Sequence, residues 1–417
     1  MPRKRLFPPP SHPQTGKRLQ SKGPEPFSVL TVNGRLVLAR RRYFARDLGS
    51  QSPLDNWLDQ AHASISHGVR ELACRLNQAA RSFEKATDNL ARCAQLRLSR
   101  ETLRQLVREA GQAVRVAEQS GRLVLSWNAG ECFIPDDQGR PTPQTRVYLG
   151  VDGVMVPLVT QAEKDARRRA VKAKRRRRGR RCPPLPRPRP GADQAFKEFK
   201  IVTFYDEPVR HRLVVLTRGN SVQAGRLVRH HAGRIGLTQA QDKVAVVDGA
   251  DWIRRQLAAQ SLPLDAVGLD FYHLAENVHK ARRAVYGEAD PADTAQPGNC
   301  WAARVLHVAK HEGYAALDAE LCGWVKGLRG AKRQAGLRLL GYVTEREAMI
   351  NYPAFTALGR QIGSGPTESM CKATTLRVKG VGKKWDADNA EAVMTLEALD
   401  QSGAWDTYWN LSLQTAL

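Results

Sequence analysis

Residues 147–158 read VYLGVDGVMVPL, an apolar strand interrupted by one carboxylate, Asp152. A strand with so little polarity is typical of a sheet that is covered on both faces. Further apolar runs and one helical pattern follow along the chain: strands at 199–205 and 213–216, a helix at 221–235, and strands at 244–247 and 266–269. This order predicts an α/β fold with a mixed sheet and helices on its faces.

The residues before this sheet predict a helical region. Residues 1–26 are rich in Pro, Lys and Arg and are expected to be disordered, and the Asn-Gly pair at 33–34 predicts the tight type I′ turn of a hairpin. Apolar residues at three- and four-residue spacing predict a helix over 53–95, and Ser99 is a good N-cap for a second helix over 100–118. The two helices are compatible with a helix-turn-helix, and equally with a plain helical hairpin.

Two further segments lie within or after the sheet. Residues 164–189 hold a run of Lys and Arg with several prolines, which repels itself and is expected to be disordered without a partner. We interpret this run as an arm that orders on DNA phosphates, the alternative being a solubilising loop. Residues 274–350 carry helical patterns again and predict a helical insertion after the last of these strands.

The charge balance is strongly basic. The chain has 66 Lys+Arg against 41 Asp+Glu, a formal net charge of +25. Such a surplus costs self-repulsion unless a polyanion neutralises it, and nucleic acid is the commonest polyanion that does so. A ribosome-associated or merely well-solvated protein is the plainer alternative.

Other compositional signals exclude several classes. The seven cysteines form no CxxC pair, which excludes a zinc finger of that spacing. No apolar run approaches the ~20 residues that a membrane span requires. Prolines follow the basic N-terminus where a signal peptide would need an apolar stretch. We therefore expect a cytoplasmic protein with no membrane partner.

Three acidic residues stand where metal chemistry would need them. Asp152 interrupts an apolar strand, Asp248 ends the apolar run 244–247, and Glu368 falls in the first turn of a helix that begins in GSGPTE at 363–368. A carboxylate beside buried strands is costly unless a cation compensates it, and divalent metals prefer oxygen ligands. Three converging carboxylates can hold two metal ions about 3.5–4 Å apart for phosphoryl displacement. Taken singly, each acid has a plainer explanation as a turn former.

Four short blocks around these acids resemble the DDE transposases of bacterial insertion sequences, in the Mutator-like branch and its Kra-type group. The blocks are YLGVDGV at 148–154, VVDGADWI at 246–253, DFYH at 270–273 and GSGPTES at 363–369, the last followed by Arg377, Gly382 and Trp385. They occur in the family's order and spacing, and the resemblance covers about residues 50–410.

The resemblance implies a ribonuclease H-like mixed-sheet catalytic core with a helical insertion before the glutamate, plus an N-terminal α-helical DNA-binding region. It makes Asp152, Asp248 and Glu368 the ligands of two Mg²⁺ or Mn²⁺ ions, and Asp270 and His273 an accessory catalytic pair. Asp270 also ends an apolar strand and competes with Asp248 for the second ligand position, but the family's order of motifs favours Asp248.

The expected domains are a basic tail with a hairpin, a helical DNA-binding region, the first part of the core, the helical insertion, and the last part of the core: residues 1–50, 51–140, 141–273 (with a basic insertion at 160–195), 274–350 and 351–417. The expected DNA contacts are basic side chains of the N-terminal helices, the arm and the segment after the glutamate: Arg100, Arg104, Arg175, Arg176, Arg177, Arg178, Lys372, Arg377, Lys379, Lys383 and Lys384. Trp385 is expected to pack in the core rather than against a base.

The predicted function is metal-dependent cleavage and transfer of DNA strands at insertion-sequence ends. It implies a homo-oligomer that brings two ends together, in the cytoplasm and associated with the nucleoid. Two alternatives stay open: a catalytically silent DNA-binding protein of transposase ancestry, and another ribonuclease H-like nuclease.

Overall fold

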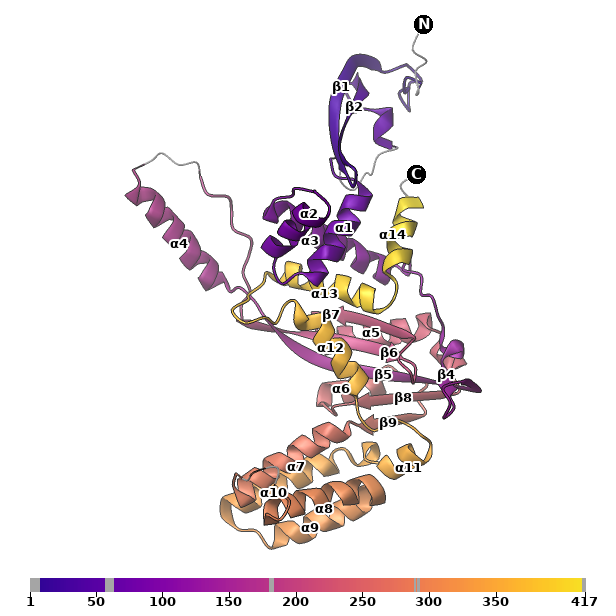
Figure 1. Cartoon of the computed structure of the whole chain (residues 1–417), viewed down its shortest axis with the longest axis vertical. Helices are drawn as coiled ribbons and strands as arrows, with labels where there is room; N and C mark the ends of the chain where they lie inside the picture. Colours follow the sequence, from indigo (N-terminus) through magenta and orange to yellow (C-terminus); the bar gives the residue numbers. More distant parts are fainter. Residues whose placement is uncertain (1–7, 57–63, 180–183, 289, 291–292, 415–417) are drawn as a thin grey trace. The chain divides into compact units, whose positions relative to one another are not determined.

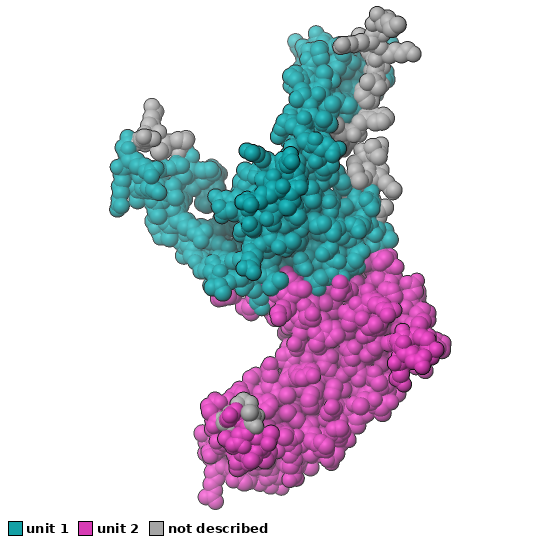
Figure 2. Space-filling model, viewed as in Figure 1, with its two compact units in different colours: residues 1–124, 157–195, 376–417 teal, residues 125–156, 196–375 magenta. Residues whose placement is uncertain are grey.

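The computed structural model describes residues 8–56, 64–179, 184–288, 290 and 293–414. The chain forms two compact units, each assembled from segments that lie far apart in the sequence (Figure 2). Unit 1 comprises residues 1–124, 157–195 and 376–417, and unit 2 comprises residues 125–156 and 196–375. None of the described helices is both long enough and apolar enough to cross a bilayer.

The centre of unit 2 is a sheet with the strand order β7-β6-β5-β8-β9, and a short β4 also pairs with β5 (Figure 1). The strands are β4 Phe133–Pro135, β5 Pro141–Pro157, β6 Phe196–Tyr205, β7 Arg212–Thr217, β8 Asp242–Val247 and β9 Ala266–Leu269. Strands β5, β8 and β9 run parallel to one another, whereas β6 and β7 run antiparallel to each other. The predicted mixed α/β sheet is confirmed, because long apolar runs specify buried strands strongly.

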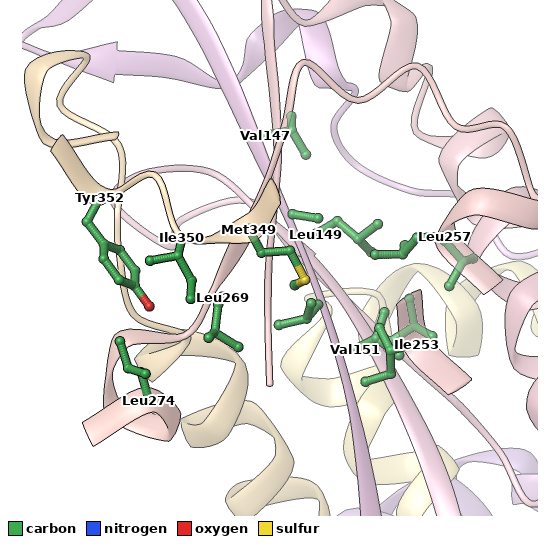
Figure 3. Close-up of a cluster of buried hydrophobic side chains, with 14 of the residues drawn as sticks. Val147, Leu149, Val151, Ile253, Leu257, Leu269, Leu274, Met349, Ile350 and Tyr352 are labelled. Carbon is green, nitrogen blue, oxygen red and sulfur yellow. The ribbon is translucent and has the colours of Figure 1, made fainter. Parts of the chain in front are cut away.

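One face of this sheet forms the main hydrophobic core of unit 2. Alternate side chains of β5, namely Val147, Leu149 and Val151, point into this core together with Ile253 and Leu257 (Figure 3). The last two belong to α6 (Asp251–Ala259), and α5 (Ser221–Arg234) covers the same face. Each such side chain contributes roughly 1.5–3 kcal/mol when fully buried.

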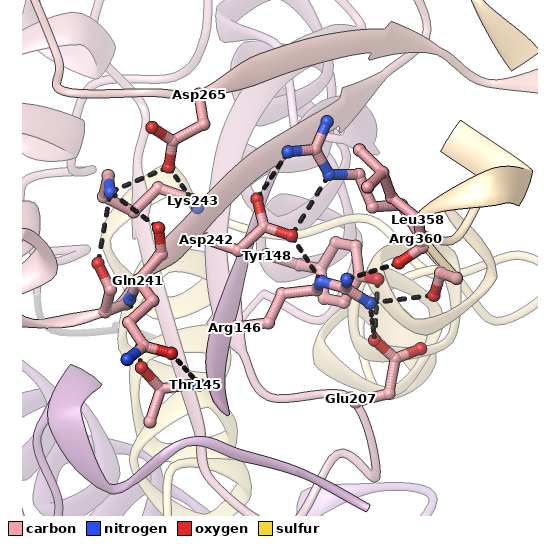
Figure 4. Close-up of polar contacts among 12 residues, drawn as sticks. Thr145, Arg146, Tyr148, Glu207, Gln241, Asp242, Lys243, Asp265, Leu358 and Arg360 are labelled. Atoms are coloured by element: carbon pink, nitrogen blue, oxygen red, sulfur yellow. Dashed lines mark hydrogen bonds and ion pairs between the residues drawn. The ribbon is translucent and has the colours of Figure 1, made fainter. Parts of the chain in front are cut away.

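A polar network fixes how β5 and β8 pair at the first residue pair that the two strands share (Figure 4). Arg146 Nε donates to Asp242 Oδ2 at 2.6 Å, and Arg360 Nη2 donates to Asp242 Oδ1 at 2.7 Å. Burial raises the pKa of Asp242, but the hydrogen bonds and charges of the two arginines outweigh it and hold that pKa below its usual value. Since Arg146 and Asp242 are register partners, this ion pair locks the alignment of the two strands.

The predicted helical insertion is present as a ring of four helices. They are α7 Phe271–Tyr286, α8 Pro297–Glu312, α9 Tyr314–Lys326 and α10 Gly330–Thr344. Each helix packs against the next, and α10 packs back on α7. After the ring, α11 (Tyr352–Ala357) leads by a loop into α12 (Gly365–Leu376).

Unit 1 is built around helices from both ends of the chain. They are α1 His67–Ala79, α2 Phe83–Cys93, α3 Arg100–Gln119, α13 Ala387–Gln401 and α14 Trp405–Gln414. Helix α13 packs against α3 so closely that a Cβ on Gly111 would lie 2.5 Å from the Ala392 backbone. The N-terminal helices therefore share a core with the C-terminal segment.

The predicted single helix over 53–95 is wrong. Residues 53–56 form a 3₁₀ turn, and the remaining described part is two helices separated at Ala80, which has extended backbone with ψ of 148°. Ser82 then caps α2 through a hydrogen bond from the Lys85 N–H. An apolar stripe that continues across a break is not evidence for one helix. Ser99 is confirmed as the N-cap of α3, and residues 57–63 lie outside the described part.

Disorder over residues 1–26 is also wrong where the structure describes this segment, while residues 1–7 lie outside it. Strand β1 (Gln20–Thr31) pairs with β2 (Gly34–Ala45), which pairs in turn with β3 (Gly49–Gln51). Prolines are tolerated because β1 is an edge strand with one neighbour. The hairpin is confirmed, but its turn residues are Val32 and Asn33, and neither has the positive φ of a type I′ turn.

The basic arm is a helix rather than a disordered loop. Helix α4 (Gln161–Arg177) begins with a capping box in which Thr160 and Glu163 exchange side-chain and backbone hydrogen bonds. No side chain of α4 is buried. Capping, good intrinsic helix formers, and basic residues in the last turn stabilise the helix despite its repulsion. The expectation of disorder is therefore corrected for this helix, and residues 180–183 lie outside the described part.

Candidate active site

Three aspartates form a row across neighbouring parallel strands in unit 2: Asp152 lies within β5, and Asp248 and Asp270 directly follow β8 and β9. Leu149 on β5 pairs with Ala245 on β8, and continuing this register by three residues places Asp152 opposite Asp248. Val247 on β8 pairs with Leu269 on β9, so the next residues along these strands are Asp248 and Asp270. Residues in register point to the same face of a sheet. This face is opposite to the one that carries Val147, Leu149 and Val151.

Helix α12 carries Glu368 in its first turn and is fastened to the same face at Gly150. A Cβ on Gly150 would lie 1.9 Å from Thr367 Oγ1 and 2.6 Å from Thr203 Oγ1. The two threonine hydroxyls are hydrogen-bonded to each other at 3.1 Å, and Thr203 Oγ1 also donates to the Gly150 carbonyl. Only glycine permits this approach of helix to strand. It fixes Glu368, the neighbour of Thr367, relative to the strand that carries Asp152.

Asp270 is fully buried and already holds several donors. Its Oδ1 accepts the Tyr272 N–H at 2.6 Å, which caps α7, and its Oδ2 accepts the Ser364 N–H at 2.9 Å. The Ser364 hydroxyl also donates to Oδ2 and lies 3.4 Å from Glu368 Oε1. Asp270 therefore anchors the loop that leads into α12, and its oxygens are largely occupied by this loop and the α7 cap.

Asp270, His273 and Glu368 are the one group of metal-ligating side chains whose atoms lie within 4.8 Å of one another in the described residues. His273 Nε2 lies 3.9 Å from Glu368 Oε1. The predicted trio of Asp152, Asp248 and Glu368 is not such a group in the described residues, and the role of these three acids as metal ligands stays a prediction. The side chain of Glu368 is 55% exposed and is long enough to rotate toward Asp152 and Asp248.

The pKa of Asp248 is raised mainly because this carboxyl group is buried. Burial and the nearby charge of Asp152 raise the pKa of Asp248, while the Ala250 N–H, His273 and Arg346 lower it in part. The Ala250 N–H donates to Asp248 Oδ1 at 2.8 Å. A buried carboxylate whose charged form is disfavoured in this way is a group that a bound cation would stabilise.

Arg346 supports the turn that follows Asp248, although no sequence pattern identifies it. Its Nε donates to the Gly249 carbonyl at 3.0 Å, its Nη1 donates to the Tyr342 carbonyl at 2.9 Å, and its guanidinium lies over the Tyr342 ring. Arg346 follows α10 closely in the chain, and its own side chain is buried. No motif marks it, since its partner Gly249 lies 97 residues away.

The expected DNA-binding residues lie in unit 1, except Lys372 in unit 2. Side chains of the arm and the segment after α12 are mostly exposed, and so is Arg100, whereas Arg104 is half-buried and paired with Glu101. Lys384 pairs with Glu163 at the start of α4. The structure therefore leaves most of these cations at the surface of their unit.

Arg377 departs from that expectation. Its side chain is buried, it donates to the Arg81 carbonyl at 2.8 Å, and it packs over the rings of Phe83 and Trp385. Burial lowers the pKa of Arg377 to about 10, which leaves it protonated at neutral pH. A guanidinium held in this way is not available to a phosphate, so Arg377 is a packing residue of unit 1. Trp385 is buried beside it, as expected.

A protein-family model and a solved structure are similar to this chain. The model of an uncharacterised protein family (UPF0236) matches residues 14–174, which is less than half of the chain. No curated protein matches the sequence. The chain is similar to a chain of the Drosophila P element transposase strand transfer complex, at 8% identity and a TM-score of 0.31, over 84% of this chain and 81% of that one. We therefore base the functional proposal on the geometry of the site.

Proposed function

We propose that this chain is a DNA transposase that cleaves and joins DNA strands with divalent metal ions. One observation carries the proposal: the register of β5 and β8, continued past its last pair, sets Asp152 opposite Asp248, and α12 carries Glu368 in its first turn on the same face. The sheet supports a ribonuclease H-like core, because β5, β6 and β7 follow one another on one side and β8 and β9 extend it in parallel on the other.

Asp152, Asp248 and Glu368 are the residues we propose to hold Mg²⁺ or Mn²⁺. The raised pKa of the buried Asp248 carboxyl fits a bound cation, and carboxylate oxygens are the ligands that such hard cations prefer. When bound, such ions activate the attacking oxygen and stabilise the leaving oxygen of a phosphodiester. Asp270 is better suited to positioning, since it already caps α7 and holds Ser364.

In this proposal, His273 orients a metal ligand, and exposed cations bind the DNA. His273, beside Glu368, holds that carboxylate toward the row of aspartates. Exposed cations of α3, of α4 and of the segment after α12 bind DNA phosphates, which gain affinity by releasing counterions. Two DNA ends must be brought together for strand transfer, so we also propose a homo-oligomer, in the cytoplasm on chromosomal DNA.

The test is cleavage of labelled DNA that carries the sequences flanking the gene, with purified protein, with and without Mg²⁺. We expect cuts at the element's ends only with the metal. Asp152→Ala and Asp248→Ala should lower the cleavage rate by at least about 10³-fold and leave DNA binding unchanged. Asp251→Asn is the matched control, because Asp251 is exposed and paired with Arg254.

The alternatives give different results in the same assay. Metal-dependent cutting of an RNA–DNA hybrid without any need for DNA ends would indicate another nuclease on this core. DNA binding with no cutting under any metal would indicate a silent DNA-binding protein. Full activity in either aspartate variant would reject the site itself.

A further inference from the structure

A cavity of about 1000 Å³ opens between α7 and α8 in unit 2. It begins at Tyr272, the residue before His273, and therefore starts at the edge of the candidate active site. The α7 residues that line it include Tyr272, Glu276, Lys280 and Arg283. They recur every three or four residues, so they form one stripe along the helix. At 1.5 Å per residue, this stripe is roughly 16 Å long.

Tyr272 is an exposed aromatic ring with a fixed support. Its side chain is 66% exposed, although aromatic rings are usually buried. A Cβ on Gly363 would lie 2.9 Å from Tyr272 Cε2, so one side of the ring rests on the Gly363 backbone. Gly363 precedes Ser364, which Asp270 holds. The ring is therefore positioned by the same loop that positions α12, while most of Tyr272 stays exposed.

The rest of the stripe is cationic at its far end. Lys280 and Arg283 line the cavity, and the one acid of the stripe, Glu276, lies 4.0 Å from Lys280. Burial and the charges of Arg282 and Arg283 lower the pKa of His279, which favours its neutral form. Apolar side chains such as Ala303 and Leu306 on α8 form the opposite wall.

This combination selects one kind of occupant. An aromatic platform beside cations and an apolar wall is the arrangement that binds single-stranded nucleic acid, with bases stacked and phosphates paired. Bases in a duplex are already stacked on each other and offer only their edges. An unpaired base offers the face that Tyr272 can contact.

We propose that the groove along α7 binds a few unpaired nucleotides of the DNA strand that leaves the active site. The first base stacks on Tyr272, and the following phosphates pair with Lys280 and Arg283. This inference rests on the proposed function for the identity of the nucleic acid, but its test does not depend on cleavage.

The experiment measures binding without metal by fluorescence anisotropy. The full-length protein is titrated with a blunt duplex and with the same duplex carrying a short single-stranded extension. We expect the wild type to bind the extended DNA about tenfold more tightly, since stacking one base on an aromatic ring is worth about 1–3 kcal/mol. Tyr272→Ala should abolish this preference, and Tyr272→Phe should keep it. A 2-aminopurine at the first unpaired position should be quenched by the wild type and the Phe variant only.

Variants that remove one positive charge from the groove test the inference a second time, independently of Tyr272. Lys280→Ala and Arg283→Ala should each reduce the preference for the extended DNA, while Lys332→Ala on α10 should not, because Lys332 is exposed but outside the groove. Thermal unfolding of each variant checks that the fold is intact. Equal affinity of the wild type for both DNAs, or an undiminished preference in a folded Tyr272→Ala variant, overturns the inference. A clear preference in a protein that never cuts DNA would support the groove and refute the transposase.

Discussion

Asp248 depends on one side chain from outside its own strand. Arg346 binds the carbonyl of Gly249, the next residue, and a Cβ on Gly249 would lie 2.8 Å from Arg346 Nε. Gly249 has φ of 73°, which other residues rarely adopt. Because residue 249 is a glycine, the Arg346 side chain can lie directly against the turn after Asp248. The end of the helical insertion therefore sets the direction of a candidate metal ligand.

We predict that Arg346→Met weakens Mn²⁺ binding by about tenfold, measured by electron paramagnetic resonance titration. A hydrogen bond from a charged group is worth about 1.5–3 kcal/mol, and losing it frees the turn that aims Asp248. Arg346→Lys should be intermediate, since it keeps the charge without the planar donors. The control is Arg254→Met, because Arg254 binds the Glu345 carbonyl and Asp251 rather than the turn. Unchanged Mn²⁺ affinity in Arg346→Met would show that the contact does not position Asp248.

At the scale of elements, the site depends on how closely α12 approaches β5. The strands could be predicted because each is a run of apolar residues, and the first turn of α12 because Pro366 follows Gly365. The contact of Gly150 with Thr367 could not be predicted, since the two residues lie more than two hundred positions apart. Repulsion among the cations of the arm predicts disorder, but the capping box at the start of α4 stabilises a helix there.

We predict that Gly150→Ala displaces α12 and abolishes strand cleavage. The new methyl would overlap Thr367 Oγ1, and overpacking of this kind costs about 1–3 kcal/mol of stability. DNA binding should persist, because the expected DNA contacts lie almost entirely in unit 1. Adding Thr367→Ala removes the overlapping Thr367 atoms but leaves Thr203 Oγ1 2.6 Å from the new methyl, so it should restore part of the cleavage rate. A folded Gly150→Ala variant with wild-type cleavage would mean that Glu368 does not need this contact.

At the scale of the whole molecule, the candidate metal ligands and most of the expected DNA contacts lie in different units. The row of aspartates and Glu368 belong to unit 2, whereas the arm and most other expected DNA contacts belong to unit 1. The net charge of +25 predicted a polyanionic partner from composition alone. Composition cannot say which cations face solvent, and Arg377 shows the consequence, since it stands beside exposed lysines in the sequence but is buried.

This division predicts how DNA binding responds to salt. Each phosphate contact contributes about 0.9 to the slope of log K against log salt concentration on duplex DNA. Replacing Arg175, Arg176, Arg177 and Arg178 by Gln should therefore reduce the slope by up to about 3.6, measured by anisotropy at several salt concentrations. The matched control replaces four exposed cations of unit 2, namely Lys326, Arg329, Lys332 and Arg333, and so changes the net charge equally. If both sets reduce the slope by the same amount, the arm acts only through net charge. A loss confined to the arm variant would mean that α4 itself contacts the DNA backbone.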